Sequence, residues 1–317
     1  MVKFIPVRYS NKEYPPDIKP KIQEITANFF NFFKHKKALQ KTELPYLSLH
    51  TDPGYRGKKG MFLSSELLNE FPVISENVFN FGSLCVSKLW FNEKWSKEFS
   101  GFLVRLTEGI ERQRIKVIEV HPPIDAYCNS LETFLKIYEA FEVEVLKEFP
   151  SAIINIENRC NPYPKRKGGK FLLSTNKDIV KLSNLISESD LKLNLVVDIP
   201  QLLSEHQLLS GHHGNILLSE REIKEALAPI REIRDHISST HIWGYDITEQ
   251  RGAHKADFNT YLNNNKELKD CFLQEIRQLF DDGKKRYFVP EVNETAKVQS
   301  IVSDLREAGI QFVEPDN

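Results

Sequence analysis

The sequence lacks several features that would set it apart from ordinary globular proteins. Its 317 residues contain no run of 18 consecutive apolar residues, and the N-terminal stretch has no long apolar segment of the secretory kind. The four cysteines lie far apart and form no CxxC pair. These absences favour a cytoplasmic protein with reduced, buried thiols and no membrane partner.

The chain also lacks an excess of charge of either sign. Its formal net charge is −1 and its estimated pI is 6.8. Bulk electrostatics therefore gives no support for general nucleic-acid affinity, and an anionic substrate would need a local basic patch.

What the sequence does contain is a series of five short apolar runs that each end on or beside a side chain able to bind a divalent metal. These side chains are His121, Glu157, Asp198, His241 and Glu291, separated by 36, 41, 43 and 50 residues. Such intervals have room for a loop, a helix and a second loop before the next strand. Polar groups are costly inside apolar strands, so their repeated placement at strand ends indicates convergence on one point.

The alternation of strands and helices predicts an α/β protein with a single (β/α)₈ TIM-barrel domain over residues 1–317. Residues 1–115 would supply strands one to three, and residues 116–317 the half with the metal site. The expected strands are Lys3–Arg8, Tyr46–His50, Leu84–Trp90, Lys116–His121, Ala152–Glu157, Leu193–Asp198, Thr240–Tyr245 and Tyr287–Glu291. The expected helices are Asp17–Gln40, Glu93–Arg114, Ser130–Glu148, Thr175–Ser187, Ser219–His236, Asn259–Phe280 and Glu294–Glu307.

In a barrel of this kind Glu157, Asp198, His241 and Glu291 would surround one centre at the carboxyl ends of the strands. Three carboxylates and one imidazole suit Zn²⁺, Mn²⁺, Fe²⁺ or Mg²⁺, and one or two ions are expected. His121 precedes two prolines, which favour extended backbone before them and aim its ring off the strand end.

Further candidates lie in the loops that follow the strands. His254 and Asp257 come after the seventh strand, where they could reach back over the barrel mouth as ligands or substrate contacts. His212 and His213 stand in a GHHG loop that we expect to cover the pocket. Basic residues after the second and fifth strands would give a cationic rim. The candidate substrate-binding residues are Arg159, Lys165, Arg166, Lys167, Lys170, Gln201, Trp243 and Arg251.

With these residues in place, the chain resembles the xylose-isomerase-like barrel superfamily, which holds sugar isomerases and epimerases alongside the endonuclease IV and ultraviolet-damage endonuclease families. The order Glu, Asp, His, Glu on strands five to eight is shared across that superfamily. The segment VIEVHPP is similar to the fourth-strand motif of the damage endonucleases, and this resemblance implies that His121 is a metal ligand.

The chain also departs from the endonuclease pattern. Those enzymes have a histidine three residues after the sixth-strand aspartate, where this chain has Gln201, and another at the end of the third strand. His50, placed on the second expected strand, is a possible substitute for the latter. The resemblance therefore implies one complete metal site and a partial second site.

Three functions remain open at this point. The first is metal-dependent hydrolysis of a phosphodiester in nucleic acid or another phosphorylated substrate, with Glu157 bridging or orienting. The second is isomerisation or epimerisation of a sugar or sugar phosphate, with Glu157 and Glu291 also moving a proton. The third is a barrel without chemistry that serves as a binding subunit. The sequence does not determine whether a protein partner or a second copy completes the pocket.

Overall fold

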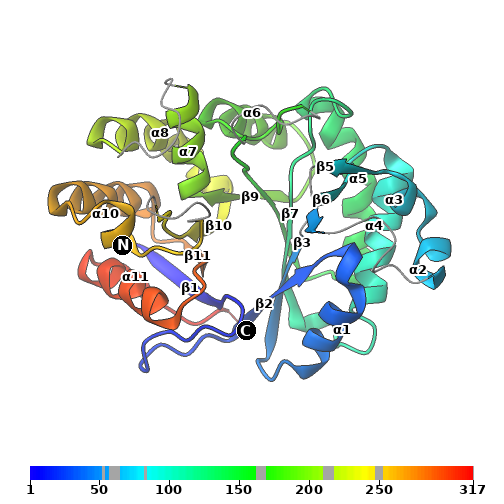
Figure 1. The fold of residues 1–317 in the computed structure, drawn as a ribbon, viewed down its shortest axis with the longest axis horizontal. Helices are drawn as coiled ribbons and strands as arrows, with labels where there is room; N and C mark the ends of the chain where they lie inside the picture. The colour runs from blue at the N-terminus through cyan, green and yellow to red at the C-terminus, as the bar shows by residue number, and fades with distance from the viewer. Residues whose placement is uncertain are drawn as a thin grey trace.

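Eight parallel strands pair in a ring in this computed structural model, and the ring closes where the last strand pairs with the first (Figure 1). Lys3 lies opposite Lys285 and Pro6 opposite Phe288 at the closure. The barrel strands in order are β1 (Lys3–Arg8), β2 (Ile22–Ala27), β3 (Tyr46–Thr51), β7 (Ile115–Val120), β8 (Ile153–Glu157), β9 (Leu193–Asp198), β10 (Ile237–Ile242) and β11 (Lys285–Pro290). The fold is a single (β/α)₈ TIM barrel, as the alternation of strands and helices predicts.

The structure describes residues 1–51, 54–56, 65–81, 84–161, 169–209, 218–246 and 253–316, and only the backbone of residues 54–56, 65, 79–81 and 84–86.

Helices surround the strands in Figure 1 and connect most of them in sequence. The α-helices are α1 (Phe32–Lys41), α2 (Ser65–Glu70), α3 (Pro72–Glu76), α4 (Glu93–Leu106), α5 (Leu131–Glu148), α6 (Asn176–Ser187), α7 (Ile199–Leu209), α8 (Glu220–Glu232), α9 (Phe258–Tyr261), α10 (Lys266–Phe280) and α11 (Thr295–Glu307). Thr175 and Ser219 begin α6 and α8 with capping boxes, so the chain enters both helices at defined residues. None of the helices in the described ranges combines the length and the apolar character that a membrane span requires.

The expected helix over Asp17–Gln40 is wrong in its first half. Residues 22–27 form β2, which pairs with all six residues of β3, and the helix begins only at Phe32. Ile22, Ile25 and Phe29 have the spacing of a helix face, but β-branched residues are also favourable in a strand. Almost every position of β2 is buried, so the strand shows no alternation that would distinguish it from a helix.

The expected third barrel strand over Leu84–Trp90 is also wrong. Residues 84–87 form β6, which pairs antiparallel with β4 (Gly54–Arg56) and β5 (Val78–Phe81) in a separate three-stranded sheet. The third barrel strand is instead Tyr46–Thr51, which pairs directly with β7. The count of eight strands survives because the missed β2 replaces the misassigned segment.

Smaller differences lie after the sixth and seventh strands. The segment expected to be a loop after Asp198 begins with α7, and the expected helix Asn259–Phe280 is two helices separated at Asn263 and Asn264, both with positive φ. The seventh strand begins at Ile237 rather than Thr240, and the eighth begins at Lys285 rather than Tyr287.

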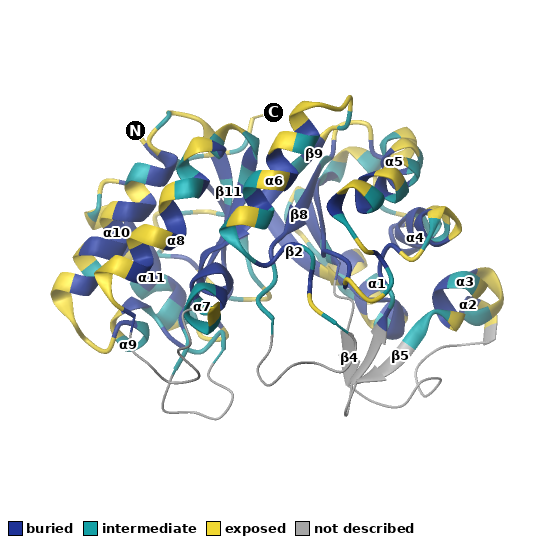
Figure 2. Cartoon of the chain, turned by 90° about the horizontal axis from the view of Figure 1, so that it is seen from above, coloured by how far each residue is buried: buried dark blue, intermediate teal, exposed yellow. Residues whose placement is uncertain are grey.

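The eight barrel strands are largely buried on both faces, as the dark colour of β8 and β9 in Figure 2 shows. Apolar side chains from the outer faces of these strands pack against the helices in one large core. The inner face carries polar residues at alternate positions, among them Glu119 on β7 with His121 just after it, and Ser239 and His241 on β10. This alternation puts the polar side chains inside the ring, where no helix can cover them.

Candidate metal centre

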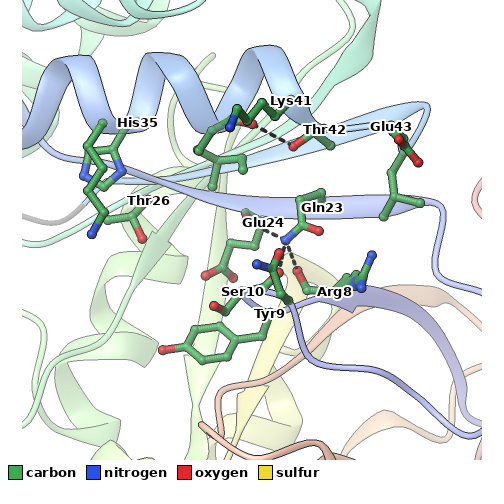
Figure 3. A pocket seen from close by; sticks show the side chains of 15 residues that line it. Arg8, Tyr9, Ser10, Gln23, Glu24, Thr26, His35, Lys41, Thr42 and Glu43 are labelled. Atoms are coloured by element: carbon green, nitrogen blue, oxygen red, sulfur yellow. Dashed lines mark hydrogen bonds between the residues drawn. The ribbon is translucent and has the colours of Figure 1, made fainter.

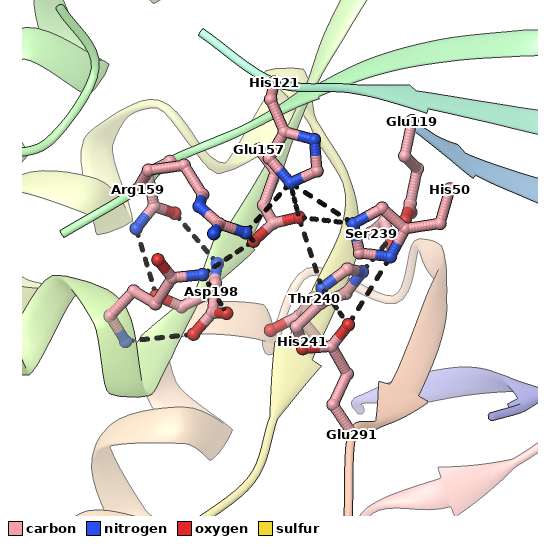
Figure 4. A network of polar contacts seen from close by, with 12 residues as sticks. His50, Glu119, His121, Glu157, Arg159, Asp198, Ser239, Thr240, His241 and Glu291 are labelled. Carbon is pink, nitrogen blue, oxygen red and sulfur yellow. Dashed lines mark hydrogen bonds and ion pairs between the residues drawn. The ribbon is translucent and has the colours of Figure 1, made fainter. Parts of the chain in front are cut away.

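Three histidines and three carboxylates from six different strands meet at the carboxyl end of the barrel (Figure 4). The residues are His50 at the end of β3, His121 just after β7, Glu157 on β8, Asp198 on β9, His241 on β10 and Glu291 just after β11. All except His50 are fully or almost fully buried, and the side chain of His50 is 13% exposed. The five candidate ligands expected at the strand ends, His121, Glu157, Asp198, His241 and Glu291, thus lie together.

Three of the ligand atoms form a nearly equilateral triangle. His50 Nε2 lies 3.1 Å from Glu157 Oε2, His121 Nε2 lies 3.2 Å from the same oxygen, and the two histidine nitrogens lie 3.3 Å apart. Two ligands of a tetrahedral ion at bond lengths of about 2.1 Å are about 3.4 Å apart. The triangle therefore has the size of one face of a tetrahedral metal site.

A second group of ligand atoms shares Glu157 with the first. His241 Nδ1 lies 3.4 Å from Glu291 Oε1 and 3.7 Å from Glu157 Oε2. Ligand atoms of Glu157, Asp198 and His241 also lie within 4.8 Å of one another. Glu157 thus stands between the two groups.

Hydrogen-bond donors from α7 and from the residue after β10 fix the carboxylates of Glu157 and Asp198. Gln201 Nε2 donates to Glu157 Oε1 at 2.7 Å and to Asp198 Oδ2 at 2.6 Å. The indole Nε1 of Trp243 donates to both oxygens of Asp198 at 3.1 and 3.0 Å. The bond from Gln201 occupies Glu157 Oε1, so the other oxygen of that carboxylate, Oε2, faces the histidines.

Burial perturbs the ionisation of the carboxylates and histidines. Burial raises the pKa of Glu291 to about 8, and burial together with the charge of Glu157 raises the pKa of Asp198 to about 6. Burial opposes the charged form of His241, but the carboxylates of Glu119 and Glu291 outweigh it and raise the pKa of that imidazole. Without a cation, the cluster would thus have to bind protons to offset its negative charge.

Buried ligand atoms without hydrogen bonds also indicate that the cluster needs a cation. Glu157 Oε2 and His241 Nδ1 are buried and have no hydrogen bond of good geometry to any described residue. Glu24 beside His50 and Glu119 beside His241 bring the number of buried carboxylates here to five, and two divalent ions with the Arg159 guanidinium would balance their five charges. Histidine and carboxylate ligands at these separations suit Zn²⁺, Mn²⁺ or Fe²⁺. The residues present therefore fit a divalent metal centre.

Other candidates from the sequence lie beside the cluster or away from it. His254 Nδ1 is 3.5 Å from Glu291 Oε2 and hydrogen-bonds the Glu291 carbonyl, and its ring stacks on Trp243 at 4.3 Å between ring centroids. Arg159 Nη1 lies 3.0 Å from His121 Nε2. Asp257 does not join the cluster: its carboxylate caps α9 at Thr260 and accepts a hydrogen bond from Ser300.

The expected basic rim is mostly outside the described residues. Lys170 is described and exposed, and its backbone pairs with Asp125. Lys165, Arg166, Lys167, Arg251, His212 and His213 all lie in the ranges that the structure leaves undescribed.

Sequence reasoning placed His50 on the wrong strand and missed two carboxylates. His50 ends the third barrel strand, which is the position where the endonuclease pattern has a histidine. Glu119 accepts a hydrogen bond from His241 Nε2 at 3.0 Å, and Glu24 on β2 lies 3.5 Å from His50 Nδ1. Glu119 could have been predicted from the alternation of side chains along the strand, because it lies two residues before His121 and faces the same side. Glu24 could not be found while β2 was taken for a helix.

A cavity of about 600 Å³ lies between the end of β1, β2 and α1 (Figure 3). The amide of Gln23 donates there to the carbonyls of Arg8, Ser10 and Glu24. The lining also includes Glu24 and, from α1, His35 and Lys41.

Fold and site together define a (β/α)₈ barrel with a candidate metal centre at its carboxyl end. No protein-family model matches the sequence, and no curated protein matches it either. Solved structures of similar shape include an IolI protein with a bound zinc atom (12% identity, TM-score 0.39, 92% of this chain and 87% of that chain covered). A sugar phosphate isomerase/epimerase from Parabacteroides distasonis is 11% identical (TM-score 0.35, 91% and 82% covered). The cellulose synthase subunit Z from Clostridioides difficile is 11% identical (TM-score 0.45, 96% and 99% covered). Similarity at this level assigns neither a family nor an activity.

Proposed function

We propose that the protein is an enzyme that hydrolyses phosphodiester bonds with two divalent ions bound at the barrel mouth. The observation that carries this proposal is the triangle of His50, His121 and Glu157. The Glu157, Asp198, His241 and Glu291 group would hold one ion, and the two histidines add a second metal subsite. Paired ions that share a carboxylate are typical of phosphoryl-transfer chemistry.

The chain's own residues divide into ligands and substrate contacts. Glu157 would be shared by the two ions, with His50 and His121 on one side and Asp198, His241 and Glu291 on the other. When bound, divalent ions lower the pKa of a water molecule and neutralise charge that develops on phosphoryl oxygens. The guanidinium of Arg159, which is 30% exposed and lies 3.9 Å from Glu157, is placed to bind a substrate phosphate at the same centre.

The presence of Gln201 favours a centre of two ions over a centre of three. In the endonuclease pattern a histidine occupies this position, but here the amide donates to both Glu157 and Asp198. Trp243 and the backbone N–H of Gln201 also donate to Asp198, so three neutral N–H groups hold that carboxylate.

A second candidate function is isomerisation or epimerisation of a sugar or sugar phosphate. Glu291 is a buried carboxylate at the barrel mouth, 3.5 Å from His254 Nδ1, so it is placed to exchange a proton with a substrate bound beside the cluster. A proton shuttle beside a metal-polarised carbonyl needs a group of this kind.

One experiment separates the two functions. Protein stripped with a chelator and reloaded with Zn²⁺, Mn²⁺ or Mg²⁺ is incubated with abasic-site duplex DNA, intact single- and double-stranded DNA, RNA, bis(p-nitrophenyl) phosphate and a panel of ketoses. We expect metal-dependent cleavage of one or more phosphodiesters. Turnover of ketoses without any cleavage would reverse the assignment.

Matched variants test the centre itself. Glu157→Gln should lower metal content and reduce activity by about 100-fold or more, because the shared ligand loses its charge. Glu142→Gln is the control: Glu142 is also buried, but it accepts hydrogen bonds from Tyr138 and Lys192 on the outer side of the barrel. If both variants keep full metal content, the metal centre is wrongly assigned.

A further inference from the structure

A buried carboxylate lies inside the barrel where none of the proposed chemistry uses it. Glu119 on β7 is 1% exposed, and it faces the interior rather than the helices. Its Oε2 lies 3.0 Å from His241 Nε2, and its Oε1 accepts a hydrogen bond of 2.9 Å from the Ser239 hydroxyl. Because β7 and β10 are not neighbours in the sheet, these contacts cross the interior of the barrel.

The position of Glu119 decides which nitrogen of His241 is left for an ion. One ring nitrogen, Nε2, is taken by the carboxylate, whereas Nδ1 is buried and faces Glu291 and Glu157 at 3.4 and 3.7 Å. A carboxylate accepts a hydrogen bond only from a protonated nitrogen, so it favours the form with hydrogen on Nε2 and a lone pair on Nδ1.

We propose that Glu119 is a positioning residue that fixes the tautomer of His241, so that the imidazole presents Nδ1 to the metal centre. This assignment rests on the proposed metal-dependent function. Ser239 completes the arrangement, because its hydroxyl holds the second oxygen of Glu119 and keeps the carboxylate from rotating away. His50 presents the opposite nitrogen to the triangle: its Nε2 faces Glu157 and His121, whereas Glu24 and Glu291 each lie 3.5 Å from its Nδ1.

The direct test is the protonation of the ring nitrogens in the zinc-loaded protein. Long-range ¹H–¹⁵N correlation spectra of ¹⁵N-histidine-labelled protein, with His241→Gln used to assign the signals, should show hydrogen on Nε2 of His241 and zinc on Nδ1. Hydrogen on Nδ1 would overturn the assignment. This readout needs no activity and no altered Glu119.

Zinc affinity gives the second readout, measured by competition with a chromophoric chelator. Glu119→Gln should weaken zinc binding about 10- to 100-fold, which is typical when a carboxylate behind a histidine ligand is lost. Ser239→Ala should weaken it less, and the buried control Glu142→Gln should leave it unchanged.

The outcomes separate this assignment from the metal centre. If wild-type protein binds zinc and Glu119→Gln binds it as tightly as Glu142→Gln does, Glu119 has no positioning role and the metal centre stands. If wild-type protein binds no divalent ion, the metal centre and the role of Glu119 are both refuted.

Discussion

Two buried tryptophans on the same side of the barrel predict very different costs for the same substitution. Trp90 and Trp95 are both almost completely buried and pack edge-to-face at 5.4 Å between ring centroids. The indole Nε1 of Trp90 donates to the backbone carbonyl of His121 at 2.7 Å, whereas Nε1 of Trp95 has no hydrogen-bond partner in the described part of the chain.

Replacing each by phenylalanine isolates that hydrogen bond. Both variants lose a similar volume, roughly 40 Å³, which costs about 1 kcal/mol at about 24 cal/mol per Å³ of cavity. Trp90→Phe also leaves a buried carbonyl unpaired, which costs a further 1–3 kcal/mol or so. Trp95→Phe instead removes an unsatisfied donor. The left-handed backbone of Trp90, with φ of 60°, is common to wild type and variant, so its strain cancels.

We therefore expect Trp90→Phe to lower the free energy of unfolding by about 2–4 kcal/mol and Trp95→Phe by about 1 kcal/mol or less. Urea unfolding followed by circular dichroism measures both. Trp90→Phe should also weaken zinc binding, since it loosens the backbone that holds His121, and Trp95→Phe should not. Equal costs for the two variants would refute the reasoning.

Two further pairs of residues test the packing and the electrostatics of the fold. A Cβ on Gly244 would lie 2.5 Å from the Ala256 carbonyl oxygen, so Gly244→Ala should destabilise the protein by about 1–3 kcal/mol. Gly101→Ala in α4 meets only Phe71 at 3.6 Å and should be neutral or stabilising by up to about 1 kcal/mol, and a loss as large as that of Gly244→Ala would contradict the packing. Burial opposes ionisation of Asp282, but hydrogen bonds from Arg286 outweigh it and lower its pKa to about 2. Wild type should therefore have a higher free energy of unfolding than Asp282→Asn above about pH 4, and this difference should disappear as pH falls through 2. A difference that does not change with pH would show that the Asp282–Arg286 ion pair does not stabilise the protein.

The part of the fold that could be predicted from sequence is the part with a strong local pattern. From residue 115 onward each barrel strand ends on or beside a ligand, and each has a following helix. The first quarter lacks that pattern: β2 is buried on both faces and overlaps a helical spacing, so only its pairing with β3 distinguishes it. The misassigned β6 is apolar like a barrel strand, and its antiparallel partners are not evident from composition.

The candidate site could likewise be predicted only in part from the sequence. The five predicted ligands meet because strand ends converge whatever the intervening residues are. The hydrogen bonds of Gln201 and Trp243 to Asp198, and that of Glu119 to His241, depend on side-chain directions inside the ring. Asp257 was expected near the site but lies outside the cluster. A carboxylate three residues from a histidine in a loop is equally suited to begin a helix, and here Asp257 caps α9.

The closure of the ring between β1 and β11 has a consequence for the order of folding. Strand β11 ends at Pro290 and pairs with residues 3–6, so this contact joins segments more than 280 residues apart. Contacts between residues this far apart in the sequence form late, because closing so long a loop costs chain entropy before the contacts stabilise the fold. Glu291 follows the closing strand directly, which makes it the last of the carboxylates to arrive. During refolding, uptake of a cation by the whole cluster would therefore report completion of the ring itself.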